Sequence, residues 1–183
     1  MDDDFKFFLI SGKARHGKTT LANMMADCYR DRGVEVVVTS YAKYIKMYAT
    51  ELTSWDGNPD SKPRELLQQM GTDIRKKFGK RDFFIKRLDE DLDIYKNYVN
   101  IVFIDDARMP IEIDYFKEKY GSKVKCINIL RPNFENDLNI LQRAHETEVG
   151  LDNYDTYDYT IVNDKSLDDL CEKARDLVGR IEN

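Results

Sequence analysis

Eight residues near the amino terminus, Gly12–Thr19, constrain what this chain can fold into more than any other part of the sequence. They read Gly-Lys-Ala-Arg-His-Gly-Lys-Thr and fit the Walker A pattern G-x-x-x-x-G-K-[ST]. The apolar run Phe5–Ile10 before them predicts a buried strand. After them, apolar residues recur at the spacing of one helix face, at Leu21, Met24, Met25 and Cys28. A strand, a glycine-rich turn and a helix in this order predict a phosphate-binding loop, or P-loop.

The P-loop predicts the groups that hold a nucleoside triphosphate and its metal. Its glycines let backbone N–H groups point at phosphate oxygens, and the helix that follows presents its N-terminus to the same anion. Lys18 is expected to reach the β- and γ-phosphates, and the Thr19 hydroxyl to ligate Mg²⁺. The predicted cofactors are ATP and Mg²⁺. The residues expected to cradle the nucleotide are Gly12, Lys13, Ala14, Arg15, His16, Gly17, Lys18, Thr19 and Thr20.

Strands and helices alternate along the rest of the chain. Further strands are predicted at 34–39, 100–105, 123–130 and 159–162, and helices at 41–53, 63–97, 111–120 and along the C-terminal segment. This alternation predicts an α/β fold with a five-stranded, mostly parallel sheet between two layers of helices. We expect residues 1–183 to form one domain with two insertions, at about 41–97 and 132–158. Both insertions would lie beyond the strand ends, where open α/β sheets bind ligands.

Two acidic residues, Asp105 and Asp106, end the predicted third strand. A carboxylate at a strand end beside a P-loop can hold Mg²⁺ or its waters. The pattern does not distinguish the two aspartates, so both are candidate metal ligands.

The motifs that are missing narrow the class of P-loop protein. A GTPase would carry D-x-x-G after this strand and an N-K-x-D motif, but Asp105-Asp106-Ala107-Arg108 has no glycine and N-K-x-D is absent. A large motor ATPase would need more than 183 residues. The size and the helical insertions favour a small-molecule kinase.

Composition and charge argue against nucleic-acid partners, membrane binding and secretion. The formal net charge of −5 disfavours non-specific binding to nucleic acid or to a membrane surface. No apolar stretch reaches the roughly 18 residues of a membrane span, and the acidic start Met1–Asp4 is unlike a signal peptide. The three widely spaced cysteines indicate reduced thiols in a cytoplasmic protein. We expect a monomer or homodimer.

Several short blocks, taken in order, resemble the deoxynucleoside monophosphate kinases of bacteriophages and bacteria, within the adenylate-kinase-like P-loop kinases. Their shared order along most of the chain carries the resemblance, and Thr147 departs from the serine usual in the family. After the P-loop the blocks are Tyr41–Lys46 with Trp55-Asp56-Gly57, Arg64–Gln68 with Gly71–Arg75, Asp106–Glu112 (compare D-x-R-x-P-x-E), His145–Glu148 (compare H-x-S-E), and Asn163 with Ser166-Leu167.

Transfer between two phosphates requires cations that offset charge repulsion. Arg64, Arg75 and Arg108 are candidates to hold the acceptor phosphate, because guanidinium can bind it through two N–H groups. The resemblance favours Arg75 and Arg108 and adds Lys43 as a substrate contact. It also implies that 41–97 binds the nucleoside monophosphate and that 132–158 is a lid.

The resemblance assigns the remaining site residues. Arg131 and Arg143 would close over the transferring phosphate when the lid closes. Asn163 would line the adenine pocket. His145 is expected to make a structural hydrogen bond.

The predicted function is ATP-dependent phosphoryl transfer to a (deoxy)nucleoside monophosphate. Two alternatives stay open. One is a kinase of another small phosphorylated metabolite, such as phosphomevalonate or dephospho-coenzyme A; Lys13, directly after the first glycine, resembles the phosphomevalonate kinase P-loop. The other is a non-catalytic nucleotide-binding module, which would be marked by loss of the P-loop lysine or the metal carboxylate. Neither is lost here.

Overall fold

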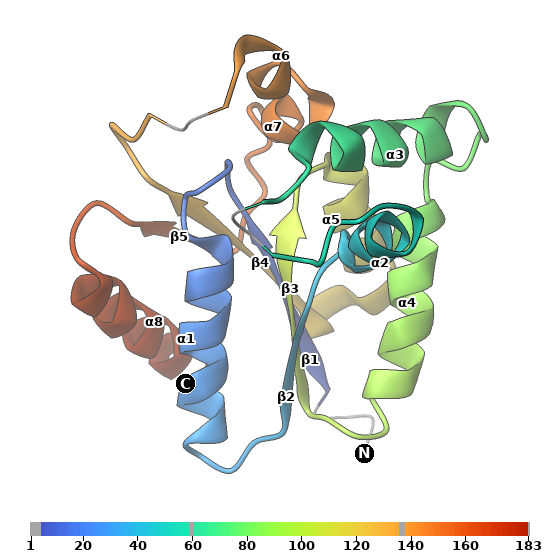
Figure 1. Cartoon of the computed structure of the whole chain (residues 1–183). Coiled ribbons are helices and arrows are strands. Elements are labelled where there is room, and N and C mark those ends of the chain that lie inside the picture. Colours follow the sequence, from blue (N-terminus) through green and yellow to red (C-terminus); the bar gives the residue numbers. More distant parts are fainter. Residues whose placement is uncertain (1–4, 59–60, 136–137, 183) are drawn as a thin grey trace.

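The apolar runs along the chain form one parallel sheet in the computed structural model, which describes residues 5–58, 61–135 and 138–182. The sheet order is β2-β3-β1-β4-β5, and every neighbouring pair is parallel (Figure 1). The predicted five-stranded sheet is confirmed. The strands are β1 (Lys6–Ser11), β2 (Val36–Thr39), β3 (Ile101–Ala107), β4 (Val124–Leu130) and β5 (Tyr159–Val162).

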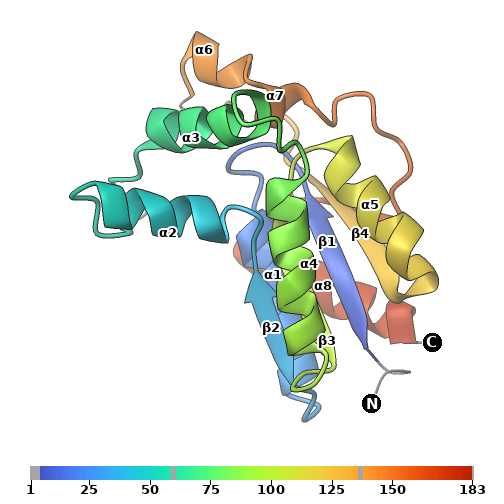
Figure 2. The same ribbon diagram turned by 90° about the vertical axis from the view of Figure 1, so that its right-hand side faces the viewer.

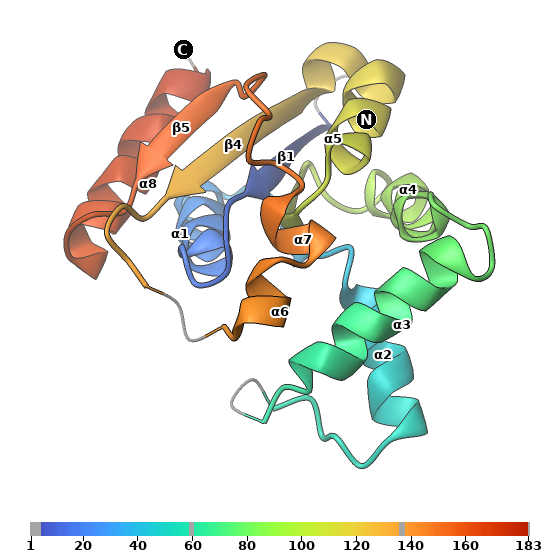
Figure 3. The ribbon, with the colours of Figure 1, turned by 90° about the horizontal axis from the view of Figure 1, so that it is seen from above.

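Alternating side chains of the strands fill two separate cores, one on each face of the sheet. Phe8 and Ile10 of β1 pack with α1 (Lys18–Arg30) and α8 (Leu167–Glu182). Phe7 and Leu9 pack with α4 (Phe83–Tyr95) and α5 (Pro110–Tyr120) on the opposite face. All four side chains are fully buried, so β1 is the apolar centre of three layers (Figures 1 and 3).

The first insertion is mainly helical, as predicted. Over the predicted helical stretch 63–97 the chain forms α3 (Arg64–Lys76) and then α4, with turns between them. Gly79 adopts φ +65° there, in the left-handed region that a continuing helix does not use. The helices α2 (Lys43–Leu52) and α3 project beyond the sheet, and after the break at Gly79 the helix α4 returns along the face of the sheet (Figure 2).

The second insertion, predicted as a lid over 132–158, divides into two parts. Its first described part contains the short helix α6 (Ile140–Arg143). Its second part begins with α7 (Glu146–Val149), and Leu151, Tyr154 and Tyr157 then pack against the core beside α5. Contacts of this kind fix the second part to the body of the protein.

Some predicted features fall outside the described residues. These are the acidic start Met1–Asp4, residues 59 and 60 of the first predicted insertion, and residues 136 and 137 of the second. Among the residues that the structure does describe, no helix combines the length and the apolar character needed to cross a lipid bilayer.

Candidate functional site

The loop between β1 and α1 has a backbone conformation that depends on its two glycines. Gly12 has φ +145°, and a Cβ atom there would lie 2.5 Å from the carbonyl oxygen of Ile129. Gly17 has φ +102°, and a Cβ atom there would lie 2.9 Å from Nδ2 of Asn163. Both positions combine a left-handed φ with close packing against β4 or the end of β5, so only glycine fits. The two invariant positions of the Walker A pattern are thus explained by geometry.

Lys18 is folded back over this loop. Its Nζ donates hydrogen bonds to the carbonyl oxygens of Gly12 (2.8 Å) and Lys13 (2.9 Å), and the residue is 7% exposed. Burial, helped by the nearby charge of Arg108, lowers the pKa of Lys18 to about 7. A bound polyphosphate would favour the ammonium form of Lys18. The charged lysine is therefore most stable when an anion occupies the site.

The adjacent aspartates of β3 have different partners because successive strand residues point to opposite faces. Asp105 is buried beside the P-loop and accepts a hydrogen bond from the Thr19 hydroxyl. Burial, and secondly the charge of Asp106, raise the pKa of Asp105. Asp106 instead accepts the backbone N–H groups of Tyr41 (2.7 Å) and Ala42 (3.0 Å). Asp106 therefore anchors the start of the first insertion.

A cavity of about 460 Å³ opens between the P-loop, the first insertion and α7. It brings together most of the predicted site residues. From the P-loop and α1 these are Ala14, Arg15, Gly17, Lys18, Thr19 and Thr20; from β3 and its end, Asp105, Asp106 and Arg108; and from α3, Arg64 and Arg75. Donor-binding and acceptor-binding candidates thus share one cavity.

The end of the cavity formed by the first insertion is strongly basic. It is lined by Lys46 from α2, Lys62 before α3, and Arg64 and Arg75 of α3, and Arg108 adds a further cation from the end of β3. Burial lowers the pKa of Lys62, and the charges of Lys46 and Arg64 act in the same direction. Among the described residues, the side chains of Lys46, Lys62 and Arg64 have no hydrogen-bond or ion-pair partner. A cluster of cations without direct ion-pair partners suits a phosphorylated ligand.

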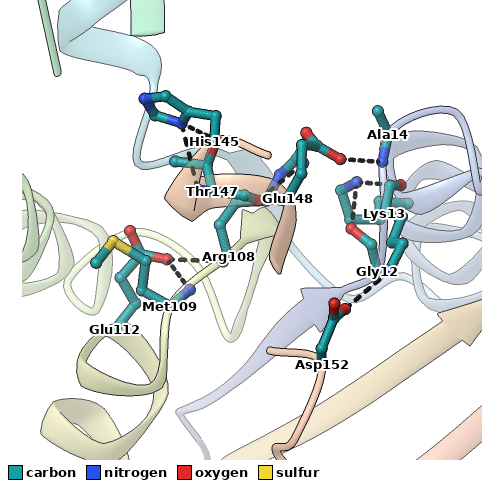
Figure 4. A network of polar contacts seen from close by, with 11 residues as sticks. Gly12, Lys13, Ala14, Arg108, Met109, Glu112, His145, Thr147, Glu148 and Asp152 are labelled. Atoms are coloured by element: carbon teal, nitrogen blue, oxygen red, sulfur yellow. Dashed lines mark hydrogen bonds and ion pairs between the residues drawn. The ribbon is translucent and has the colours of Figure 1, made fainter. Parts of the chain in front are cut away.

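The two arginines favoured for the acceptor are held by carboxylates of α7. Nη2 of Arg75 lies 2.6 Å from Oε1 of Glu146, and Nη1 of Arg108 pairs with Oε1 of Glu148. The second oxygen of Glu148 accepts the N–H of Ala14 in the P-loop at 3.0 Å (Figure 4). The α7 helix therefore connects Arg75 and Arg108 to the phosphate loop.

The two arginines predicted to close over the transferring phosphate lie elsewhere. The guanidinium of Arg131 stacks 4.1 Å from the ring centroid of Phe134, and Nε of Arg143 donates to the carbonyl of Leu138 at 2.8 Å. Neither arginine lines the cavity. Their proposed closure over the phosphate would require the first part of the insertion to move.

Three more candidates, Lys43, Asn163 and His16, bond to other parts of the protein. Nζ of Lys43 lies 2.9 Å from Asp91 of α4 and does not line the cavity. Nδ2 of Asn163 donates to the His16 carbonyl at 3.0 Å, and Nδ1 of His16 accepts the N–H of Arg131 at 3.2 Å. These bonds tie the P-loop to the ends of β4 and β5. His16 points at the β4 backbone, where burial lowers its pKa.

Sequence reasoning missed Lys46, Lys62 and Glu148 as site residues. Lys46 and Glu148 stand inside blocks that carried the family resemblance, which is the signal that could have found them. Lys62 has no such signal, because it lies in an irregular segment between two helices. His145 behaves as expected: its Nδ1 bonds to Thr147 Oγ1 (2.9 Å) and its Nε2 to Thr72 Oγ1 (3.1 Å).

Comparison with solved structures identifies the fold. The APS kinase of Mycobacterium tuberculosis, solved in complex with AMPPNP and APS, aligns over 98% of both chains with a TM-score of 0.61 and 12% identity. A cysteine-to-alanine variant of that enzyme aligns over 98% of both chains with a TM-score of 0.56 and 11% identity. At such low identity these structures show the fold alone, which is that of P-loop kinases.

Sequence comparison identifies the family. No curated protein matches the chain. The family described as deoxynucleotide monophosphate kinase matches residues 30–174, which is well over half of the 183 residues and begins after the P-loop. The chain therefore belongs to the deoxynucleotide monophosphate kinase family, and it is a nucleoside monophosphate kinase.

Proposed function

We propose that this kinase transfers the γ-phosphoryl group of ATP to the phosphate of a deoxynucleoside monophosphate, with Mg²⁺ bound at the P-loop. One observation carries this proposal: the P-loop and a cluster of unpaired cations face the same cavity. An acceptor phosphate oxygen would bond to the γ-phosphorus while the bond to the β-phosphate oxygen breaks, giving ADP and a deoxynucleoside diphosphate. The acceptor is already anionic, so no strong general base is needed.

The residues around the P-loop fit a magnesium ion. Mg²⁺ in kinase sites uses one or two protein oxygens, waters and substrate phosphate oxygens. Asp105 and the Thr19 hydroxyl supply such oxygens side by side. Among the described residues no group of three or more His, Cys, Asp or Glu could hold a metal by itself, which accords with a metal that arrives with its nucleotide. When bound, Mg²⁺ neutralises charge on the β- and γ-phosphates.

We assign the basic end of the cavity to the acceptor. Arg75 and Arg108 would bind its phosphate through their N–H groups, with Arg64 beside them. Lys46 and Lys62 add positive charge at the same end. Lys18 and the N–H groups of the P-loop would hold the donor phosphates.

The free cysteines bear on where the protein works. The cysteines Cys28, Cys126 and Cys171 are all free thiols, which suits a reducing cytoplasm. We propose a monomer or homodimer whose partner is the small-molecule nucleotide, with no nucleic-acid partner.

A substrate panel tests the proposed function. ADP release would be followed with each deoxynucleoside monophosphate, each ribonucleoside monophosphate, phosphomevalonate and dephospho-coenzyme A. We expect turnover with at least one deoxynucleoside monophosphate and none with the last two. Turnover confined to phosphomevalonate or dephospho-coenzyme A, or no turnover with any acceptor, would contradict the proposal.

Arg75→Ala is expected to weaken the acceptor far more than ATP. Arg75 lines the basic end of the cavity, so its loss removes a charged hydrogen bond worth about 1.5–3 kcal/mol from acceptor binding only. That corresponds to a rise of about 10- to 100-fold in KM for the deoxynucleoside monophosphate. Steady-state kinetics with each substrate varied in turn measure both effects. Equal weakening of ATP and acceptor would argue against the assignment.

A further inference from the structure

One carboxylate links the two halves of the candidate site. Oε2 of Glu148 accepts the N–H of Ala14 at 3.0 Å, and Oε1 pairs with Nη1 of Arg108. The Glu148 side chain is 9% exposed. Figure 4 shows it between the P-loop on one side and Arg108 on the other. A buried carboxylate with a charged partner and a backbone N–H is held in a single position.

The helix that carries Glu148 has little freedom to move. A Cβ atom at Gly150, directly after α7, would lie 2.8 Å from the carbonyl oxygen of Arg108. The start of α7 is tied to α3 by the hydrogen bond between His145 and Thr72. Beyond α7, Asp152 lies 2.8 Å from Nζ of Lys13, an exposed ion pair that adds only a little. Glu148 therefore extends from a fixed wall of the cavity.

Arg108 is held along one edge of its guanidinium and open along the other. Nη1 donates both to Glu148 and to the carbonyl of Thr147 (3.2 Å). Nε and Nη2 have no hydrogen-bond partner among the described residues. The backbone N–H groups of Arg108 and Met109 are both accepted by the buried carboxylate of Glu112, at 2.7 and 3.0 Å. The free edge has the two-donor geometry that a phosphate binds.

We propose that Glu148 is a positioning residue, which joins the P-loop to Arg108 and so fixes the distance between the donor phosphates and the acceptor. The role rests on the proposed function, because it assigns Arg108 to the transferring or acceptor phosphate. In this role Glu148 acts through the N–H of Ala14 and the guanidinium of Arg108. In-line transfer depends steeply on this distance, and a misplacement of about 1 Å can cost about 100-fold in rate.

An opposing role for Glu148 leads to different kinetics. A carboxylate bound to a P-loop N–H and to an arginine also resembles a phosphate, and it could occupy the site until substrate displaces it. Removing its charge would then free Arg108 and tighten acceptor binding without a loss of kcat. The positioning role predicts the reverse, a loss of kcat with little change in binding.

Glu148→Gln separates the two roles. Glutamine keeps an oxygen for the N–H of Ala14 but loses the charge that holds Arg108. We expect kcat to fall about 10- to 100-fold, with KM for ATP and for the deoxynucleoside monophosphate changed by less than about threefold. Glu118→Gln, an exposed change on α5 that also removes one negative charge, is the matched control and should leave kcat unchanged. Unchanged kcat with tighter acceptor binding in Glu148→Gln would overturn the proposal.

A double-mutant cycle tests the link itself. In an Arg108→Ala background, Glu148→Gln should have almost no further effect on kcat, because the arginine it positions is gone. Independent, multiplicative losses would overturn the proposal. If Glu148→Gln fails to fold, Glu148→Asp keeps the charge but is too short to span both partners, and a folded Glu148→Asp with full kcat would also overturn it. The wild-type protein in the same assay tests the proposed function separately from the role of Glu148. If the wild type shows no turnover, the kinase assignment itself is refuted.

Discussion

Lys18→Ala is expected to lower kcat/KM for phosphoryl transfer by about 1000-fold or more while the protein stays folded. Among the described residues, Lys18 is the only lysine whose Nζ donates hydrogen bonds to the P-loop backbone, at the carbonyl oxygens of Gly12 and Lys13. Its charge would offset the charge that builds on the transferring phosphate, and loss of such a group costs about 10²–10³-fold or more. A 1000-fold loss corresponds to about 4 kcal/mol of transition-state stabilisation.

The fold should survive this change because α1 keeps its apolar contacts. Leu21 and Met25 of α1 remain fully buried against the sheet. Circular dichroism and a thermal melt would show this, and Lys86→Ala, an exposed change on α4, is the control for loss of one lysine. Near-normal turnover by Lys18→Ala would refute the role of the P-loop in catalysis.

The lowered pKa of Lys18 leads to a second prediction, which concerns proton uptake when ATP binds. In the free protein this pKa is about 7, and a bound triphosphate raises it because the opposite charge favours the ammonium form. Above pH 7 the wild type should therefore take up a proton when ATP binds, and its affinity for ATP should fall as the pH rises through 7. Calorimetry in buffers of different ionisation enthalpy measures the uptake, which Lys18→Ala should reduce.

Asp105→Asn is expected to impair catalysis, whereas Asp106→Asn is expected to lower the stability of the fold. Asp105 is bonded to Thr19 beside the P-loop, so its neutralisation should lower kcat by about 100-fold or more and raise the Mg²⁺ concentration needed for half-maximal rate. The asparagine oxygen can still accept the Thr19 hydroxyl, so the melting temperature should change little. Kinetics at varied Mg²⁺ and a thermal melt measure the two effects.

Asp106→Asn should instead cost stability. Both carboxylate oxygens accept backbone N–H groups, of Tyr41 and Ala42, and an asparagine presents an NH₂ group to one of them. An unsatisfied buried N–H costs about 1–3 kcal/mol, which lowers the melting temperature by roughly 2–4 °C per kcal/mol in a chain of this size. If Asp106→Asn showed the larger loss of kcat and the stronger Mg²⁺ dependence, the assignment of the two aspartates would be reversed.

The order of elements was predictable because its signals are local. Each buried strand is a short apolar run, and α8 repeats apolar residues at helical spacing with Leu170, Ala174, Leu177 and Val178 buried. The division of 63–97 into two helices also has a local cause. Gly79 adopts a left-handed φ there, whereas Gly71 stays helical within α3, and the sequence pattern does not distinguish these two glycines.

The sequence by itself determined the P-loop, the α/β fold and the kinase class, because a Walker A motif between a strand and a helix specifies its own local geometry. Only the tertiary structure decided which residues meet that loop. Adjacent residues of β3 point to opposite faces, so packing alone separates Asp105 from Asp106. Glu148 reaches Ala14 across 134 residues of chain because α7 packs on the end of β3. No local pattern encodes contacts over such a separation, and the acceptor end of the site is built from them.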